Sequence, residues 1–132
     1  MKGSAATRSN AAALPGQRAE FSNVDTYKSD VARHIMLHNP EHTFSGALPP
    51  MLPAIVVLRI TVDRSGKVTK AVVQRSRDDD ASKVALASMQ RSGELPRPHN
   101  LAAGPGGSLT FMETFLFNAD YRFQLRTLAP VQ

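Results

Sequence analysis

The sequence contains no cysteine and no tryptophan, and only 6% of its residues are aromatic. Without cysteine the chain forms no disulfide, no thiolate metal site and no cysteine nucleophile. No stretch approaches the roughly 20 apolar residues that a membrane-spanning helix needs. The sequence also lacks a G-x-S-x-G elbow, an H-E-x-x-H pair and a phosphate-binding loop. We therefore expect a protein that is not an enzyme, with no catalytic residue, no cofactor and no small-molecule substrate.

The 132 residues, of which 42% are hydrophobic, suit one domain with one modest core. Residues 1–20 are small and polar, show no period and include the helix breaker Leu14-Pro15-Gly16. We expect this segment to be a disordered tail or the end of a linker. Residues 21–132 then form the domain.

The chain is basic, with a net charge of +5 and a pI near 10.1. A basic pI is typical of proteins that bind nucleic acids. Here, however, the lysines and arginines are spread along the chain among aspartates and glutamates, so they indicate ordinary surface charge. We expect no nucleic-acid partner, and a basic nucleic-acid-binding module remains the less favoured alternative.

Two segments have the pattern of amphipathic helices. Residues Val24–His38 place apolar side chains at helical spacing after Ser22 and Asn23, which are favourable capping residues. A second helix is expected from about Asp80 to Ser92, where the preceding aspartates favour the positive end of the helix dipole. The same aspartates do not predict a calcium site, because consecutive carboxylates do not converge on one ion.

Strand patterns fill much of the remaining sequence. The apolar alternation over 54–62 and the return segment 68–75 predict a β-hairpin, with an irregularity near Lys70. From 109 to 125 the odd positions are mostly apolar, with Glu113 as the discordant residue. We expect a turn at 118–120 to divide this long segment into two strands. The pattern predicts an α+β fold, with two helices packed on a small three- or four-stranded antiparallel sheet.

The histidines are the only other candidates for a metal site. His34 and His38 are four residues apart on the first predicted helix, and His42 follows after Asn39-Pro40. Two histidines at this spacing on a helix can share a metal ion. Because the proline ends the helix before His42, we expect a packed or exposed pair of histidines and no metal.

Several segments resemble the C-terminal domain of the TonB/TolA family, the energy transducers of Gram-negative bacteria. The resemblance covers about Tyr27 to Leu128 and rests on the order of the elements together with four stretches of sequence. These stretches are the hairpin 57–68, the strand 72–76, the proline-rich Leu95-Pro96-Arg97-Pro98 and the terminal segment 115–123. No family motif is diagnostic alone, and their ordered combination carries the resemblance.

The resemblance implies a periplasmic module that couples inner-membrane energy to outer-membrane receptors. Its partners would be an outer-membrane receptor or another envelope protein, and inner-membrane motor proteins through a segment that this sequence does not contain. The alternative is a free-standing interaction or assembly protein of the envelope that has the fold without the energy coupling.

Family members bind an extended receptor segment at the edge of the last strand, so the resemblance places the binding edge on 109–117, or on 121–128 if that segment folds back beside it. Residues at even positions should point outward there because strand side chains alternate. In the alternative, both strands are simply part of the core sheet, and Glu113, Arg122 and Arg126 protect its edge against unwanted pairing. The expected protein-binding residues are Thr110, Met112, Thr114, Leu116, Arg122, Gln124 and Arg126.

Overall fold

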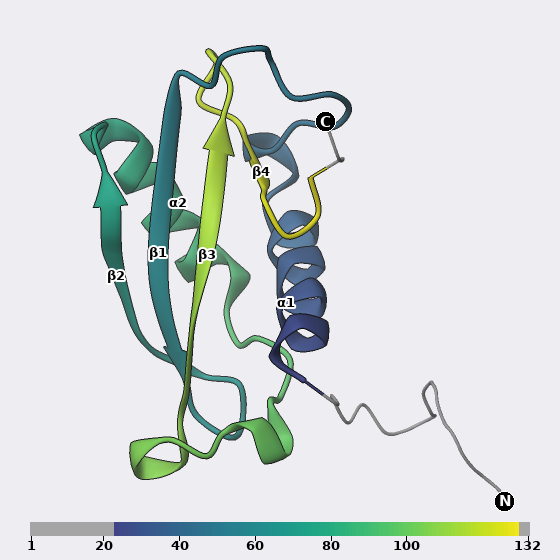
Figure 1. Cartoon of the computed structure of the whole chain (residues 1–132), viewed down its shortest axis with the longest axis vertical. Helices are drawn as coiled ribbons and strands as arrows, with labels where there is room; N and C mark the ends of the chain where they lie inside the picture. Colours follow the sequence, from purple (N-terminus) through teal and green to yellow (C-terminus); the bar gives the residue numbers. More distant parts are fainter. Residues whose placement is uncertain (1–22, 130–132) are drawn as a thin grey trace, which may run out of the picture.

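The computed structural model describes residues 23–129, in which it contains two α-helices and one four-stranded antiparallel sheet. The strands lie in the order β2-β1-β3-β4, and the helices lie behind one face of the sheet (Figure 1). The expected α+β fold is therefore confirmed. The elements are α1 (Val24–His38), β1 (Ala54–Val62), β2 (Val68–Ser76), α2 (Asp79–Ser92), β3 (Leu109–Phe117) and β4 (Phe123–Leu125).

One hydrophobic core joins the helices to the sheet. Alternate side chains of β1 and β3 point towards the helices, and the aromatic rings of Phe115 and Phe123 pack with their centroids 4.9 Å apart. The apolar stripe of each helix covers these side chains. The opposite face of the sheet, which we call the outer face, carries no helix in the described part of the chain. The core includes Tyr27, Val31, Ile35, Val56, Leu58, Ile60, Ala81, Ala85, Met89, Phe111, Phe115 and Phe117.

Side-chain caps explain where the helices begin. The Asn23 carboxamide oxygen accepts a hydrogen bond of 2.9 Å from the Thr26 backbone N–H, so α1 starts where the sequence predicts. The Asp78 carboxylate accepts a 3.0 Å bond from the Ala81 N–H. Because Asp78 is the capping residue, α2 begins at Asp79, one residue earlier than expected.

The hairpin of β1 and β2 is irregular, as the sequence predicts. The register shifts between Val57 and Leu58, and again between Thr61 and Val62. In the turn, Gly66 has a φ of +91°, and its carbonyl accepts a 2.9 Å bond from the Leu95 N–H. This contact ties the hairpin turn to the chain that follows α2.

The long loops contain three short 3-10 turns, namely Pro40–His42, His99–Leu101 and Pro105–Gly107. The expected tail, residues 1–20, lies outside the described residues. In residues 23–129 no helix is long and apolar enough to cross a membrane.

Replacing Gly66 should destabilise the domain more than replacing another glycine of similar backbone conformation. A Cβ on Gly66 would overlap the Leu95 carbonyl oxygen, whereas a Cβ on Gly46, at φ +92°, has no atom within 4 Å. In chemical denaturation we expect Gly46→Ala to lower the free energy of unfolding by about 1 kcal/mol. Gly66→Ala should cost at least about 2 kcal/mol more. Equal losses would show that the contact with Leu95 contributes nothing.

Candidate functional site at the sheet edge

The two sides of β3 are paired to different extents. β1 pairs with all of β3, from Leu109 to Phe117. β4 pairs only with Phe115, Leu116 and Phe117, and the Arg126 N–H adds a 3.0 Å bond to the Thr114 carbonyl. Residues 109–113 therefore have a partner strand on one side only within the described chain.

The backbone groups on the uncovered side belong to Thr110 and Met112. Backbone N–H and C=O groups of alternate residues in a strand point to the same side. Because the Thr114 carbonyl faces β4, the same groups of Met112 and Thr110 face that side as well. No strand lies beside them in residues 23–129. Both residues were expected at the binding edge, and both are exposed.

Glu113 covers the next edge group, although its side chain points into the protein. Its Oε2 accepts a 2.9 Å bond from the Thr114 N–H, and its Oε1 accepts a 2.7 Å bond from the Thr127 hydroxyl. Only 2% of Glu113 is exposed. Glu113 therefore interrupts the apolar alternation for a structural reason. Its carboxylate accepts a hydrogen bond from the Thr114 N–H, a backbone donor at the sheet edge that would otherwise lack a partner.

Burial dominates the electrostatics of Glu113 and raises the pKa of its carboxyl group above the ordinary value. The hydrogen bonds from Thr127 and Thr114 oppose this effect, as does the positive charge of Lys28 on α1. The net direction is upward. The folded protein therefore holds the proton of Glu113 more tightly than the unfolded chain does.

The expectation that Leu116 and Gln124 point to solvent is wrong. The two residues pair in the register of β3 and β4, yet Leu116 is 1% exposed and Gln124 is 5% exposed. The Gln124 carboxamide nitrogen donates a 2.8 Å bond to the Gly46 carbonyl, which places the loop after α1 against this end of the sheet. These two side chains are therefore unavailable to a partner.

The same loop covers the outer edge of β4. Thr43 forms a parallel bridge with Phe123, and the Phe44 N–H donates a 3.2 Å bond to the Phe123 carbonyl. We expected the free edge to move to 121–128 if that segment folded back beside β3. This expectation is wrong at Phe123, because the loop already occupies its outer side. The free groups remain on β3.

The remaining predicted residues, Arg122 and Arg126, are exposed. Arg122 ends the turn at 118–120, in which the Asn118 Oδ1 accepts bonds from the Asp120 and Arg122 N–H groups. The expected turn is confirmed, although β4 is shorter than the predicted 121–128. Arg126 follows β4 directly and lies next to Thr114.

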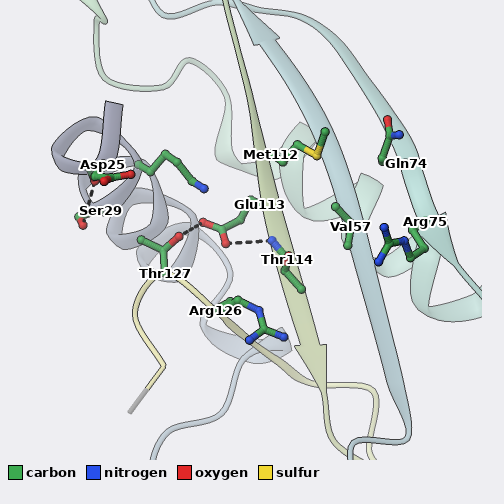
Figure 2. Close-up of a pocket in the computed structure, with 11 residues that line it drawn as sticks. Asp25, Ser29, Val57, Gln74, Arg75, Met112, Glu113, Thr114, Arg126 and Thr127 are labelled. Atoms are coloured by element: carbon green, nitrogen blue, oxygen red, sulfur yellow. Dashed lines mark hydrogen bonds between the residues drawn. The ribbon is translucent and has the colours of Figure 1, made fainter. Parts of the chain in front are cut away.

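A cavity of about 570 Å³ surrounds the point where β4 stops, and we call it the notch. In Figure 2, Asp25 and Ser29 of α1 face it from one side of β3, and Val57 and Arg75 from the other. The sequence did not identify these four residues, because only the fold brings them to β3. The notch is lined by Asp25, Lys28, Ser29, Val57, Gln74, Arg75, Met112, Glu113, Thr114, Arg126 and Thr127.

The histidines lie far from this edge in sequence and are engaged in the helix layer. The rings of His34 and His38 stack with centroids 4.0 Å apart. The His34 Nε2 lies 2.7 Å from the Ser92 carbonyl, and the His38 Nδ1 lies 2.8 Å from the His34 carbonyl. Among residues 23–129 no group of three histidine or acidic side chains is placed to hold a metal ion.

Comparison with known proteins gives no family assignment. No protein-family model matches the chain, and neither does any curated protein or solved structure. The candidate site therefore rests on the geometry of β3 and its neighbours.

The buried Glu113 carboxyl should make stability depend on pH. Its pKa is higher in the folded state than its ordinary value of 4.5, so the free energy of unfolding falls as pH rises from 4.5 through the folded pKa. The loss is about 1.4 kcal/mol for each pH unit between the two pKa values. We expect Glu113→Gln to abolish this slope in urea denaturation measured between pH 4 and 8.

Glu94→Gln is the matched control, because Glu94 is exposed and the change in net charge is the same. The slope should persist in this control. If Glu113→Gln and Glu94→Gln show the same slope as the unchanged protein, the buried carboxyl does not hold its proton as described.

Proposed function

We propose that this chain is a protein-binding module that adds an extended peptide to the uncovered part of β3. The observation that carries the proposal is that β4 stops after three residues. This leaves the backbone groups of Thr110 and Met112 without a neighbouring strand in the described chain, and Met112 lines a cavity. A peptide strand in this position would continue the line of β4. Backbone hydrogen bonds would supply affinity, and alternate side chains would supply specificity.

The surroundings of the notch favour an extended ligand. A strand beside β3 would place every second side chain on the outer face, near Met112, and the others towards α1. Met112 is 45% exposed and offers apolar contact on the outer face. On the α1 side, Asp25, Lys28 and Ser29 line the cavity with polar groups, one acidic and one basic. The notch therefore has distinct surfaces for the two sets of side chains.

We propose further that the module works in the periplasm, coupling inner-membrane energy to an outer-membrane receptor. The support for this role is the resemblance to TonB-type domains, together with an order of helix, hairpin, helix and terminal strands that agrees with it. Motor proteins of the inner membrane would act through a segment outside this sequence. A free-standing envelope protein without energy coupling would use the same edge. Finding a membrane anchor and a long proline-rich linker in the gene product would support the energy-coupling role over this alternative.

Proline at position 112 should abolish peptide binding. Met112→Pro removes an N–H that faces the notch and leaves the hydrogen bonds between β3 and β1 in place. An envelope-receptor peptide should bind the unchanged protein with a Kd in the micromolar range, about −8 kcal/mol, because ordering the peptide opposes much of the gain. Calorimetric titration should show at least a tenfold loss for the proline variant.

Two matched variants complete this experiment. Met112→Ala removes the side chain but keeps the N–H, so it should weaken binding only slightly. Ala71→Pro removes an outward N–H from β2 at the opposite edge of the sheet, and it should leave binding unchanged. Circular dichroism checks that each variant folds. Loss of binding in Ala71→Pro, with Met112→Pro unaffected, would place the peptide on β2 and contradict the proposal.

A further inference from the structure

The strands of the outer face carry exposed cations and no exposed acid. The acids at its borders are Asp78, which lines a cavity with Arg75 and Arg126 and caps α2, and Asp25 on the α1 side of the notch. Exposed cationic side chains lie on β1, on β2 and directly after β4, and the sequences of β1 and β2 contain no acidic residue. The one acidic residue of β3 is Glu113, whose side chain is buried on the helix side. Among residues 23–129 the single ion pair is Arg33–Asp30 on α1, so no cation of the outer face is paired. These cations are Arg59, Lys70, Arg75 and Arg126.

The cations border an apolar strip. Val57 pairs with Arg75 on one side and with Thr114 on the other, and Arg126 lies next to Thr114. Two residues further along β1, Arg59 pairs with Met112. Figure 2 shows the side chains of Arg75 and Arg126 on either side of Val57 and Thr114. A ligand here therefore meets aliphatic groups in the middle and guanidinium groups at the sides.

We propose that the peptide bound in the notch is an acidic one, in which aliphatic and acidic residues are combined and the acidic side chains face Arg75 and Arg126. This inference rests on the proposed function, and it adds the chemistry of the partner. Both arginine side chains line the notch: Arg126 follows β4 directly, whereas Arg75 lies on β2, with β1 and β3 between it and the peptide. Guanidinium groups also match the geometry of carboxylates in bidentate pairs. Opposite charges at this face would speed association as well as select the partner.

Charge excludes two other occupants of this surface. The segment 1–22 has Lys2, Arg8 and Arg18 against a single acid, Glu20, so it has the same sign as the outer face. A second copy of the chain has a net charge of +5 and would bring like charges together. Each of these contacts would be repulsive.

The side chains of the outer face also favour a peptide over a nucleic acid. Single-stranded nucleic acids bind open sheets by stacking their bases on aromatic rings. β1 and β2 contain no aromatic residue, and Phe111, Phe115 and Phe117 of β3 are buried on the helix side. The aliphatic strip beside an uncovered strand edge suits side chains and backbone of an extended peptide.

Three ten-residue peptides of one design test the inference. Valine alternates with glutamate in the first, with threonine in the second and with lysine in the third. By fluorescence anisotropy at moderate salt, we expect the glutamate peptide to bind about tenfold more tightly than the threonine peptide, and the lysine peptide not to bind. Equal binding of the glutamate and threonine peptides would overturn the acidic preference and leave edge pairing standing. Binding by none of the three would contradict the proposed function as well.

Charge-reversed variants locate the contact. Arg126→Glu should weaken binding of the glutamate peptide about tenfold, and Arg75→Glu about threefold, and in each variant this loss should exceed the loss for the threonine peptide. Lys83→Glu is the control, since Lys83 is an exposed residue of α2 on the helix side and its replacement changes the net charge equally. The same loss in Lys83→Glu would show that net charge, and not the outer face, selects the peptide.

A nucleic-acid ligand is a distinct outcome of the same assay. We expect an oligothymidylate of about fifteen nucleotides to bind at least tenfold more weakly than the glutamate peptide. Tighter binding of the oligonucleotide, falling steeply with salt and lost in Arg126→Glu, would assign the outer face to nucleic acid and overturn the proposal.

Discussion

Each backbone N–H and C=O group of a β-strand needs a hydrogen-bond partner, and a strand has two sides on which partners can lie. β3 is paired with β1 along its whole length, whereas β4 covers it for only three residues. The difference arises at the turn after Phe117, where Asn118 reverses the chain, and at Arg126, where the returning chain makes its last backbone bond to β3. The notch and its free backbone groups follow from this unequal pairing.

The protein satisfies part of the edge with its own side chains and leaves part of it open. Glu113 lies at the boundary, because its carboxylate binds the Thr114 N–H and the Thr127 hydroxyl at the same time. A buried carboxylate is costly unless its oxygens are hydrogen-bonded, and here both oxygens are. Beyond this boundary no internal group reaches Met112 in the described chain. The edge of β3 is thus hydrogen-bonded at 114–117, where the C-terminal segment runs beside it. It has no partner strand at 110–112 in the described chain.

Much of the fold is predictable from local sequence patterns. The bounds of α1, the irregular hairpin and the division of 109–125 into two strands all follow from capping residues and periodicity, which act over a few neighbouring residues. The alternation also predicts which face of β3 is buried. Glu113 stands out in the sequence as a discordant residue, although its partner Thr127 is fourteen positions away and only the fold brings them together.

The candidate site is less predictable, because exposure depends on long-range packing. Leu116 and Gln124 have the parity of outward residues, yet the loop after α1 folds back, and its Gly46 carbonyl accepts a bond from Gln124. A loop rich in proline and glycine gives no periodic signal of where it will pack. Strand order also depends on long-range pairing, so the sequence does not reveal that β1 pairs with β3 and that Val57 and Arg75 line one cavity with Met112.

Amide hydrogen exchange on the complex shows whether a peptide pairs with the uncovered part of β3. The Thr110 and Met112 N–H groups lie on the side of β3 that β4 leaves unpaired, and a bound strand would give them hydrogen-bond partners. We expect that adding a binding peptide slows exchange of one or both of these amides, while Ala71 and Val73 on the edge of β2 exchange as before. Slower exchange confined to β2 or to the helices, with Thr110 and Met112 unchanged, would contradict this pairing.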